Sequence, residues 1–291
     1  MIISQLNGGL GNQMFQYAAG RRLAYTLSAD FKIDITGLES NKLRGYALDC
    51  FNTQLTFTTP SDLKLVNKGN ASRLARIKKI ICGDWHRSRI TCYKERHFHF
   101  DPIVLSLSDN SYLDGYWQSE KYFLDVADII KNDFTFTSTP SETNQSMAEK
   151  ILNHNAVAIH IRRGDYIADP NANKIHNTYN IEYYRKAISN ILGKVNDPHF
   201  YIFSDEPDWV KNNFIIDSPT TYVSHNNEST CYEDMRLISL CKHQIIANSS
   251  FSWWGAWLNS NPDKIVIAPQ RWFNVTETDT SDLIPNSWLK I

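Results

Sequence analysis

Residues 1–35 read MIISQLNGGLGNQMFQYAAGRRLAYTLSADFKIDI, and this segment predicts the fold class. The apolar residues 1–6 predict a short buried strand, and a glycine-rich loop follows over 7–11. Apolar residues recur at helical spacing over 12–27, and alternation over 31–35 predicts a second strand. A strand, a helix and a strand in this order are typical of a parallel sheet, so the sequence predicts an α/β fold.

The same alternation of strands and helices is predicted in the second half of the chain. Strands are predicted over 156–161, 199–203, 244–247 and 264–268, and helices over 181–192, 208–214, 231–241 and 251–258. The polar segment 135–155, which contains Pro140, predicts a linker. Two α/β halves joined by a linker predict two Rossmann-like domains facing a cleft. We assign 1–150 to the first domain and 151–273 to the second, and expect 274–291 to return to the first.

Composition excludes several classes of protein. The 291 residues carry 30 Lys+Arg and 31 Asp+Glu, a net charge of −1, and 42% are hydrophobic. This disfavours disorder, coiled coils and dedicated nucleic-acid binders. Five cysteines without a C-x-x-C motif fit neither a disulfide framework nor a zinc ribbon. The sequence shows neither a signal peptide nor an apolar run of 18 residues, so we expect a cytoplasmic protein.

One segment departs from this charge balance. Residues 64–96 contain ten Lys or Arg and only two acids, and the first part has apolar residues at helical spacing. Two interpretations are open. The segment is either a solvated helix face, or a basic amphipathic surface that contacts the anionic inner face of the membrane or a lipid-linked acceptor.

The loop over residues 7–13 imitates a nucleotide-binding loop. Gly9 and Gly11 match the first two glycines of the dinucleotide fingerprint, and Asp34 stands where a ribose-binding acid is expected. However, Met14 occupies the third glycine position, and no Walker A motif follows. The loop is therefore either a tight turn before a helix, or an anion site at a helix N-terminus.

The strand over 157–161 runs into Arg162, Arg163, Gly164 and Asp165. Ligands of parallel sheets bind at the carboxyl ends of strands, and a guanidinium presents a rigid fork of donors to phosphate oxygens. This segment therefore predicts a phosphate clamp, with His160 and Arg162 on one face of the strand. The alternative is a surface pair between an arginine and Asp165.

A serine- and tryptophan-rich turn, residues 248–255, follows the predicted strand over 244–247. Ser249 and Ser250 either cap the next helix or offer hydroxyl and N–H groups to a phosphate, while Phe251 packs the helix or walls a pocket. Upstream, Asp234 begins a predicted helix. It is either a partner of the helix dipole or, in a cleft, an acceptor for the N1–H and N2–H pair of guanine.

Four segments together resemble the α-1,2-fucosyltransferases of glycosyltransferase family 11, and the likeness spans nearly the whole chain. They are GGLGNQMFQYAAGRRLA at 8–24, HIRRGDY at 160–166, FSDE at 203–206 and NSSFSWWGAWL at 248–258. The resemblance implies a GT-B-like fold that holds GDP-β-L-fucose mainly in the second domain. It also implies inverting transfer of L-fucose to the 2-hydroxyl of a terminal β-galactoside, giving an α-1,2-fucoside. Animal members carry an N-terminal membrane anchor, and this chain resembles the bacterial kind.

The resemblance also implies site residues. Those assigned to the donor are Gly11, Asn12, Arg162, Asp234, Ser249, Ser250 and Phe251. Those assigned to catalysis are Arg162, Asp165 and His160. No strict D-x-D motif occurs, so we expect no metal and no cofactor, and protein groups must neutralise the departing diphosphate. Either Asp165 or His160 takes the acceptor's proton, or the leaving phosphate does.

Three rival functions are left open by the residues. They are transfer of another sugar from a nucleotide, non-catalytic binding of a carbohydrate or nucleotide, and a dinucleotide-dependent oxidoreductase. The expected partners are GDP-fucose and a galactose-terminated oligosaccharide, with no nucleic acid. The sequence does not distinguish galactose in lactose, in a lipopolysaccharide unit or in a host-like glycan.

Overall fold

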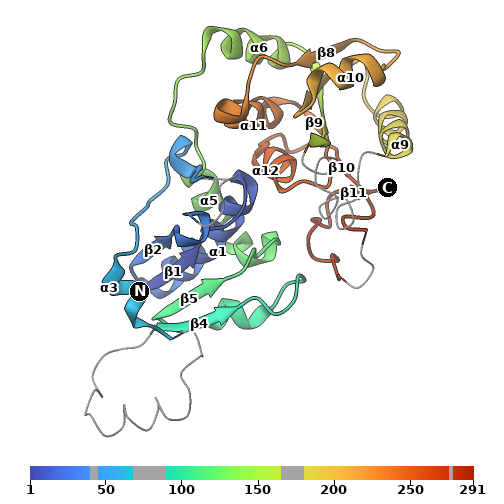
Figure 1. Ribbon diagram of the computed structural model, residues 1–291. Coiled ribbons are helices and arrows are strands. Elements are labelled where there is room, and N and C mark those ends of the chain that lie inside the picture. Colours follow the sequence, from blue (N-terminus) through green and yellow to red (C-terminus); the bar gives the residue numbers. More distant parts are fainter. Residues whose placement is uncertain (40–44, 68–89, 165–179, 275–277) are drawn as a thin grey trace, which may run out of the picture. The chain divides into compact units, whose positions relative to one another are not determined.

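The computed structural model describes residues 1–39, 45–67, 90–164, 180–274 and 278–291 (Figure 1). The chain divides into two compact units, Met1–Thr135 (unit 1) and Phe136–Ile291 (unit 2). Each unit contains one sheet, and all strand pairs given for both sheets are parallel. The α/β class predicted from the sequence is therefore confirmed.

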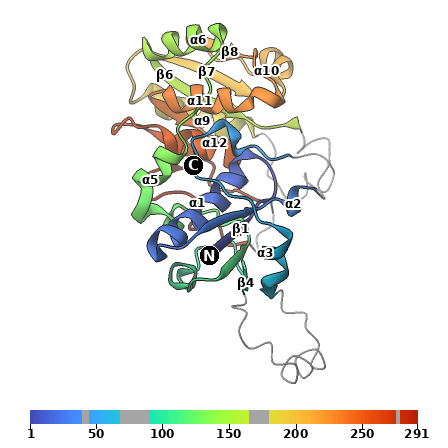
Figure 2. The same ribbon diagram turned by 90° about the vertical axis from the view of Figure 1, so that its left-hand side faces the viewer.

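Unit 1 is built on a five-stranded sheet in the order β2-β1-β5-β4-β3. Its strands and α-helices are β1 (Ile2–Gln5), α1 (Leu10–Leu27), β2 (Phe31–Asp34), α2 (Thr36–Glu39), α3 (Pro60–Leu65), β3 (Val66–Asn67), β4 (Ile90–Lys94), β5 (Ser111–Asp114) and α5 (Ala127–Asp133). Figure 2 shows α1 alongside β1. This helix begins earlier than predicted, because the carbonyl of Gly9 accepts hydrogen bonds from the N–H groups of Asn12 and Gln13.

Unit 2 is built on a six-stranded sheet in the order β11-β10-β9-β6-β7-β8. Its strands and α-helices are α6 (Glu142–Leu152), β6 (Asn155–Ile161), α9 (Ile181–Leu192), β7 (Pro198–Ser204), α10 (Pro207–Asn213), β8 (Thr220–Val223), α11 (Cys231–Leu240), β9 (His243–Ile245), α12 (Ser250–Leu258), β10 (Val266–Ala268) and β11 (Leu289–Lys290). Counted along unit 2 from β8, the strand order is 3-2-1-4-5-6, that of a doubly wound fold. The order reverses between β6 and β9, which is where such sheets bind ligands.

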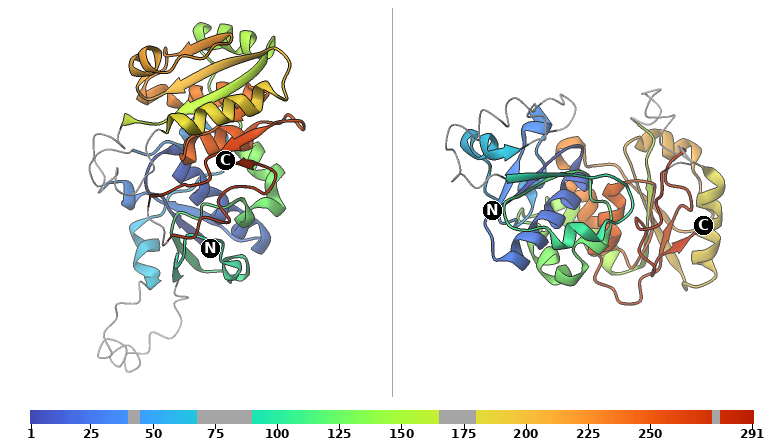
Figure 3. Two further views of the ribbon diagram at one scale, coloured as in Figure 1. Left: turned by 90° about the vertical axis from the view of Figure 1, so that its right-hand side faces the viewer. Right: turned by 90° about the horizontal axis from the view of Figure 1, so that it is seen from below.

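Helices cover both faces of this second sheet. Val157, Ile159 and Ile161 of β6 pack with α9 and α10 in one apolar cluster, and Ala156 and Ala158 face a second cluster that includes α11. Figure 3 (left) shows α9, in yellow, lying along one face of the sheet. Burial on both faces explains why β6 reads as an almost continuous apolar run.

The predicted linker over 135–155 contains helix α6, so the linker prediction was wrong. Ser141 caps this helix by accepting a hydrogen bond from the N–H of Asn144 at 3.3 Å. Ile151 is fully buried in the second apolar cluster, the one that includes α11. The polar composition reflects the exposed face of an amphipathic helix. Because α6 packs within unit 2, the division falls after Thr135 and not after residue 150.

The C-terminal strand also lies in unit 2. Leu289 of β11 pairs with Ile267 of β10, and the N–H of Gln270 donates to the carbonyl of Ile291 at 2.7 Å. The described part of 274–291 therefore completes the second sheet, where the sequence predicted a return to the first domain. The short strand has too few apolar residues to be recognised without its partner.

The predicted basic surface over 64–96 lies mostly outside the described residues, which exclude 68–89. The proposed membrane contact therefore stays a prediction. In the described part of the chain, no helix is both long enough and apolar enough to cross a bilayer.

Candidate functional site

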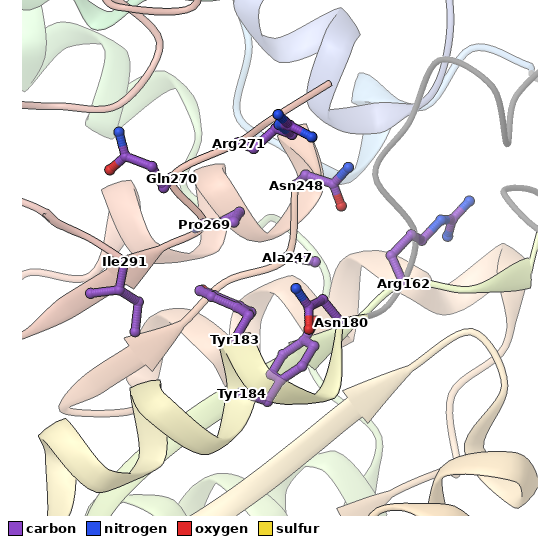
Figure 4. A pocket seen from close by; sticks show the side chains of 10 residues that line it. All are labelled: Arg162, Asn180, Tyr183, Tyr184, Ala247, Asn248, Pro269, Gln270, Arg271 and Ile291. Atoms are coloured by element: carbon purple, nitrogen blue, oxygen red, sulfur yellow. The ribbon is translucent and has the colours of Figure 1, made fainter. Parts of the chain in front are cut away.

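Unit 2 contains a cavity of about 300 Å³ at the carboxyl ends of β6, β9 and β10 (Figure 4). The loops after these strands contribute Arg162, Asn248 and Arg271, and α9 contributes Tyr183 and Tyr184. The cavity thus adjoins the point where the strand order of the sheet reverses. This position and its guanidinium and amide groups make it the candidate site.

Asp205, at the end of β7, organises the turn that carries Arg162. Its Oδ2 lies 3.2 Å from Nη1 of Arg162. Oδ1 accepts a hydrogen bond from the N–H of Arg163 and Oδ2 one from the N–H of Gly164, both at 3.0 Å. A Cβ at Gly164 would come within 2.8 Å of Oδ2, so a larger residue here would displace the Asp205 carboxylate. Asp205 therefore holds both the backbone of the turn and the side chain of Arg162.

The two adjacent arginines have different surroundings. Nε of Arg163 lies 3.0 Å from a carboxylate oxygen of Glu206, and its guanidinium carbon lies 3.3 Å from the ring centroid of Trp209. These contacts hold Arg163 at α10. Arg162 alone of the pair lines the cavity. Strand β6 ends at Ile161, so the predicted alternation does not extend to Arg162.

Tyr183 and Tyr184 join α9 to the ends of three strands. The Tyr183 hydroxyl lies 2.6 Å from the carbonyl oxygen of Ile246 and 3.0 Å from that of Ile267. The Tyr184 hydroxyl donates to the carbonyl of His160 at 2.9 Å. All three carbonyls lie at or near strand ends, so the two hydroxyls tie α9 to the carboxyl edge of the sheet. They fix the loops that line the cavity.

The serine turn lies next to the end of β6, because the rings of His160 and Phe251 are 5.5 Å apart. Ser249 is the N-cap residue of α12, yet its side chain makes no capping hydrogen bond. Asn248 instead joins two loops, since its Nδ2 donates to the carbonyl of Trp272 at 3.0 Å. The structure therefore places His160 of one motif next to Phe251 of the other.

His160 is buried beside this turn. Burial, and to a smaller extent the charge of Arg162, lower the pKa of its imidazole to about 3. Its Nδ1 has no hydrogen-bond partner among the described residues. The ring is therefore neutral at physiological pH, and a base this weak is poorly suited to accept a proton there.

Asp234 lies in the first turn of α11. Its Oδ1 accepts a hydrogen bond from Nδ2 of Asn226 at 2.7 Å, and the amide of Asn226 is in turn paired with that of Asn144. Burial raises the pKa of Asp234 to about 6, the Asn226 hydrogen bond acts in the opposite direction, and the charge of Glu233 adds to the rise. A carboxylate with one oriented oxygen is suited to accept N–H donors from a ligand.

The predicted residues Gly11 and Asn12 belong to α1, in unit 1. Oδ1 of Asn12 accepts a hydrogen bond from Nε2 of Gln118 at 2.8 Å. Asp34 is buried in the same unit and accepts a hydrogen bond from the Tyr112 hydroxyl at 2.6 Å. Since Asp34 serves an internal contact, the structure gives no support to the dinucleotide interpretation.

Several lining residues were missed from the sequence. Arg271 follows the short apolar strand β10 as Arg162 follows β6, so the same pattern could have identified it. The two tyrosines of α9 gave no comparable signal, because aromatic residues in a helix usually pack the core. Asp165 lies outside the described residues. Within the described ranges, no cluster of three or more His, Cys, Asp or Glu is arranged to hold a metal ion.

Comparison with known proteins identifies the family. The sequence model described as glycosyl transferase family 11 matches residues 1–291. The chain is 32% identical to an α-1,2-colitosyltransferase of Escherichia coli, over 100% of this chain and 99% of that protein. It is 25% identical to the human galactoside α-(1,2)-fucosyltransferase 1, over 90% of this chain and 66% of that protein.

A solved structure shows the same fold. An FUT1 variant of Arabidopsis thaliana in complex with GDP superposes with a TM-score of 0.50 at 10% identity, covering 91% of this chain and 69% of that one. Together with the two parallel α/β units, this likeness confirms the predicted GT-B-like class. From the match of the family model and the full-length relative, the chain belongs to glycosyltransferase family 11.

Proposed function

We propose that this protein transfers L-fucose, with inversion, from GDP-β-L-fucose to the 2-hydroxyl of a terminal β-galactoside. The observation that carries the proposal is the cavity at the reversal point of the second sheet, which Arg162 and Asn248 both line. A guanidinium and an amide at the ends of parallel strands suit a nucleotide diphosphate. The human relative, a galactoside α-(1,2)-fucosyltransferase, supports the choice of sugar and linkage.

Charge on the departing diphosphate is the main barrier that the protein must lower. During transfer the bond between C1 of fucose and the β-phosphate oxygen breaks, and the acceptor O2 forms a new bond to C1 from the opposite face. The leaving GDP gains negative charge, which Arg162 is placed to stabilise at the cavity. Because the sequence has no strict D-x-D motif, we propose that protein groups do this without a metal.

The acceptor's proton needs a destination. The low pKa of His160, about 3, disfavours this residue as the base. We therefore propose that Asp165 or a phosphate oxygen of the leaving GDP takes the proton. Asp165→Asn distinguishes these routes: retained turnover with a flat pH profile assigns the proton to phosphate, and loss of turnover with intact GDP binding assigns it to Asp165.

Asp234 is proposed to recognise guanine. Asn226 holds one carboxylate oxygen at 2.7 Å, so the second can accept from the base, whose N1–H and N2–H groups are adjacent donors. Neither adenine nor uracil presents this pair of donors, so such a contact would select guanine. Ser249, Ser250 and Phe251 are proposed to complete the donor site beside the diphosphate. The assignment of Gly11 and Asn12 to the donor stays a prediction.

Colitose is a second candidate sugar, favoured by the full-length likeness to an α-1,2-colitosyltransferase. Colitose is L-fucose without its 3-hydroxyl, so both donors would present the same nucleotide and linkage. A site that hydrogen-bonds the 3-hydroxyl would reject colitose strongly, whereas a site that leaves this position open would accept both sugars. The donor preference is therefore a direct measure of contacts at C3.

One experiment tests the proposal. Purified protein is given GDP-fucose or GDP-colitose with lactose, a galactose-terminated lipopolysaccharide unit or a host-like glycan, and the product linkage is assigned by NMR. An α-1,2-fucoside formed in preference to a colitoside supports the proposal. Preferred colitosyl transfer makes colitose the donor sugar. GDP binding without transfer to any acceptor favours a non-catalytic module, and transfer only from other nucleotides contradicts the GDP-sugar assignment.

A further inference from the structure

We propose that Arg271 is a second diphosphate-binding residue, which binds the donor's phosphates from the β10 side of the cavity while Arg162 binds them from the β6 side. This inference deepens the proposed function and rests on it. It starts from the composition of the cavity, whose lining residues include both arginines (Figure 4).

The cavity has an excess of positive charge. Arg162 and Arg271 are the two lining side chains that are charged at neutral pH. None of the described lining residues has an acidic side chain. In Figure 4 the amide of Asn248 is seen between the two arginines. The diphosphate of a nucleotide sugar carries one negative charge on each phosphate. Arginines on two sides of one cavity suit such an anionic ligand better than a neutral one.

The segment that carries Arg271 is fixed on both sides. The N–H of Gln270 donates to the carbonyl of Ile291 at 2.7 Å, and the carbonyl of Trp272 accepts from Nδ2 of Asn248 at 3.0 Å. Trp272 is also buried, whereas the Arg271 side chain is exposed. A backbone that is already ordered spares the ligand part of the entropic cost of fixing the guanidinium.

The two arginines differ in how their charge is used within the protein. Arg162 forms an ion pair with Asp205 at 3.2 Å, which offsets part of its charge and sets its orientation. In the described part of the chain, no carboxylate forms an ion pair with Arg271. Its charge is therefore available to a ligand. As GDP leaves and its β-phosphate gains charge, this second cation stabilises the product state together with Arg162.

The test compares Arg271→Ala and Arg271→Lys with Arg185→Ala as the matched control. Arg185 is an exposed arginine of α9 that pairs with Glu182 at 2.8 Å and does not line the cavity. Calorimetry measures the affinities for GDP, inorganic pyrophosphate and guanosine. We expect Arg271→Ala to bind GDP and pyrophosphate about 10- to 100-fold more weakly, as for loss of charge-assisted hydrogen bonds, with guanosine unchanged. Arg271→Lys should recover part of the loss, and Arg185→Ala should match the wild type.

The outcomes separate this inference from the proposed donor. Unchanged affinity of Arg271→Ala for both GDP and pyrophosphate overturns the role of Arg271 and leaves the donor assignment intact. Arg271-dependent pyrophosphate binding without preference for GDP over ADP or UDP supports the role of Arg271 and contradicts the guanine assignment. If the wild type binds neither GDP nor pyrophosphate, both proposals are wrong. Circular dichroism and thermal melting verify that each variant is folded.

Discussion

The carboxylate of Asp205 lies 3.2 Å from Nη1 of Arg162 while it also accepts the N–H groups of Arg163 and Gly164. One side chain at the end of β7 thus sets both the guanidinium and the turn that carries it. Asp205→Asn would place amide hydrogens against N–H donors at one of these contacts. We expect kcat/KM to fall about 10- to 100-fold, as when a charged hydrogen-bonding partner is lost.

The control for this variant is Glu182→Gln, which removes a carboxylate from an exposed ion pair with Arg185. Exposed ion pairs contribute little to stability, so Glu182→Gln should remain folded and keep wild-type kinetics. Steady-state transfer assays and melting curves of both variants check the prediction. Wild-type kinetics in folded Asp205→Asn would show that Arg162 does not depend on this carboxylate for its position.

Substitution of Arg162 is expected to lower activity more than substitution of Asp205. Arg162→Ala removes a preorganised donor to the leaving phosphate, so kcat should fall about 10²- to 10³-fold. Arg162→Lys should fail nearly as badly, because an ammonium cannot reproduce the bidentate fork of a guanidinium. Single-turnover rates at saturating GDP-fucose measure the effect. A rate close to that of the wild type in either variant contradicts the proposed role.

GDP binding should depend on pH through Asp234. Only the ionised carboxylate accepts the donors of guanine, and burial raises the pKa of this residue to about 6. Affinity should therefore be full above pH 7 and fall as the pH drops through about 6, by up to tenfold per pH unit. The GDP phosphate titrates in the same range, so the quantity to measure is the ratio of wild-type to Asp234→Asn affinity. A ratio that is constant between pH 5 and 8 excludes this role.

Gly8 precedes α1 with a φ of 75°, in the left-handed region. A Cβ there would also come within 2.6 Å of Nδ2 of Asn12. Gly8→Ala should lower the free energy of unfolding by about 1–2 kcal/mol through backbone strain. Gly193→Ala is the matched control, since Gly193 has an ordinary helical conformation and its added Cβ would meet only normal contacts at 3.6 Å. Urea unfolding measures the free energy of unfolding of both variants. Equal values for Gly8→Ala and Gly193→Ala would show that strain at Gly8 is unimportant.

Activity is expected to persist without divalent metal, because no strict D-x-D motif is present and two arginines line the cavity. Transfer rates in EDTA should equal those measured with added Mg²⁺ or Mn²⁺. A rate that collapses in EDTA and returns with Mn²⁺ would assign the charge stabilisation to a metal.

The strongly periodic elements could be predicted from the sequence alone. Apolar spacing predicted α9 with the bounds that the structure gives and placed β6 and β7 within a residue. Elements whose stability comes from partners were missed. Helix α6 looked like a linker because only its inner face is apolar, and the two-residue strand β11 depends on pairing with β10.

The α/β class and the motifs that resemble family 11 could be predicted from the sequence, because both depend on residues close together in the chain. The resemblance also assigned Arg162 and the serine turn to one donor site. Three features became apparent only from the fold: Asp205 orients Arg162, two tyrosines of α9 tie three strand ends together, and Arg271 lines the same cavity as Arg162. Those contacts join segments distant in the sequence. They follow from strand order and helix packing, which no local pattern of residues specifies.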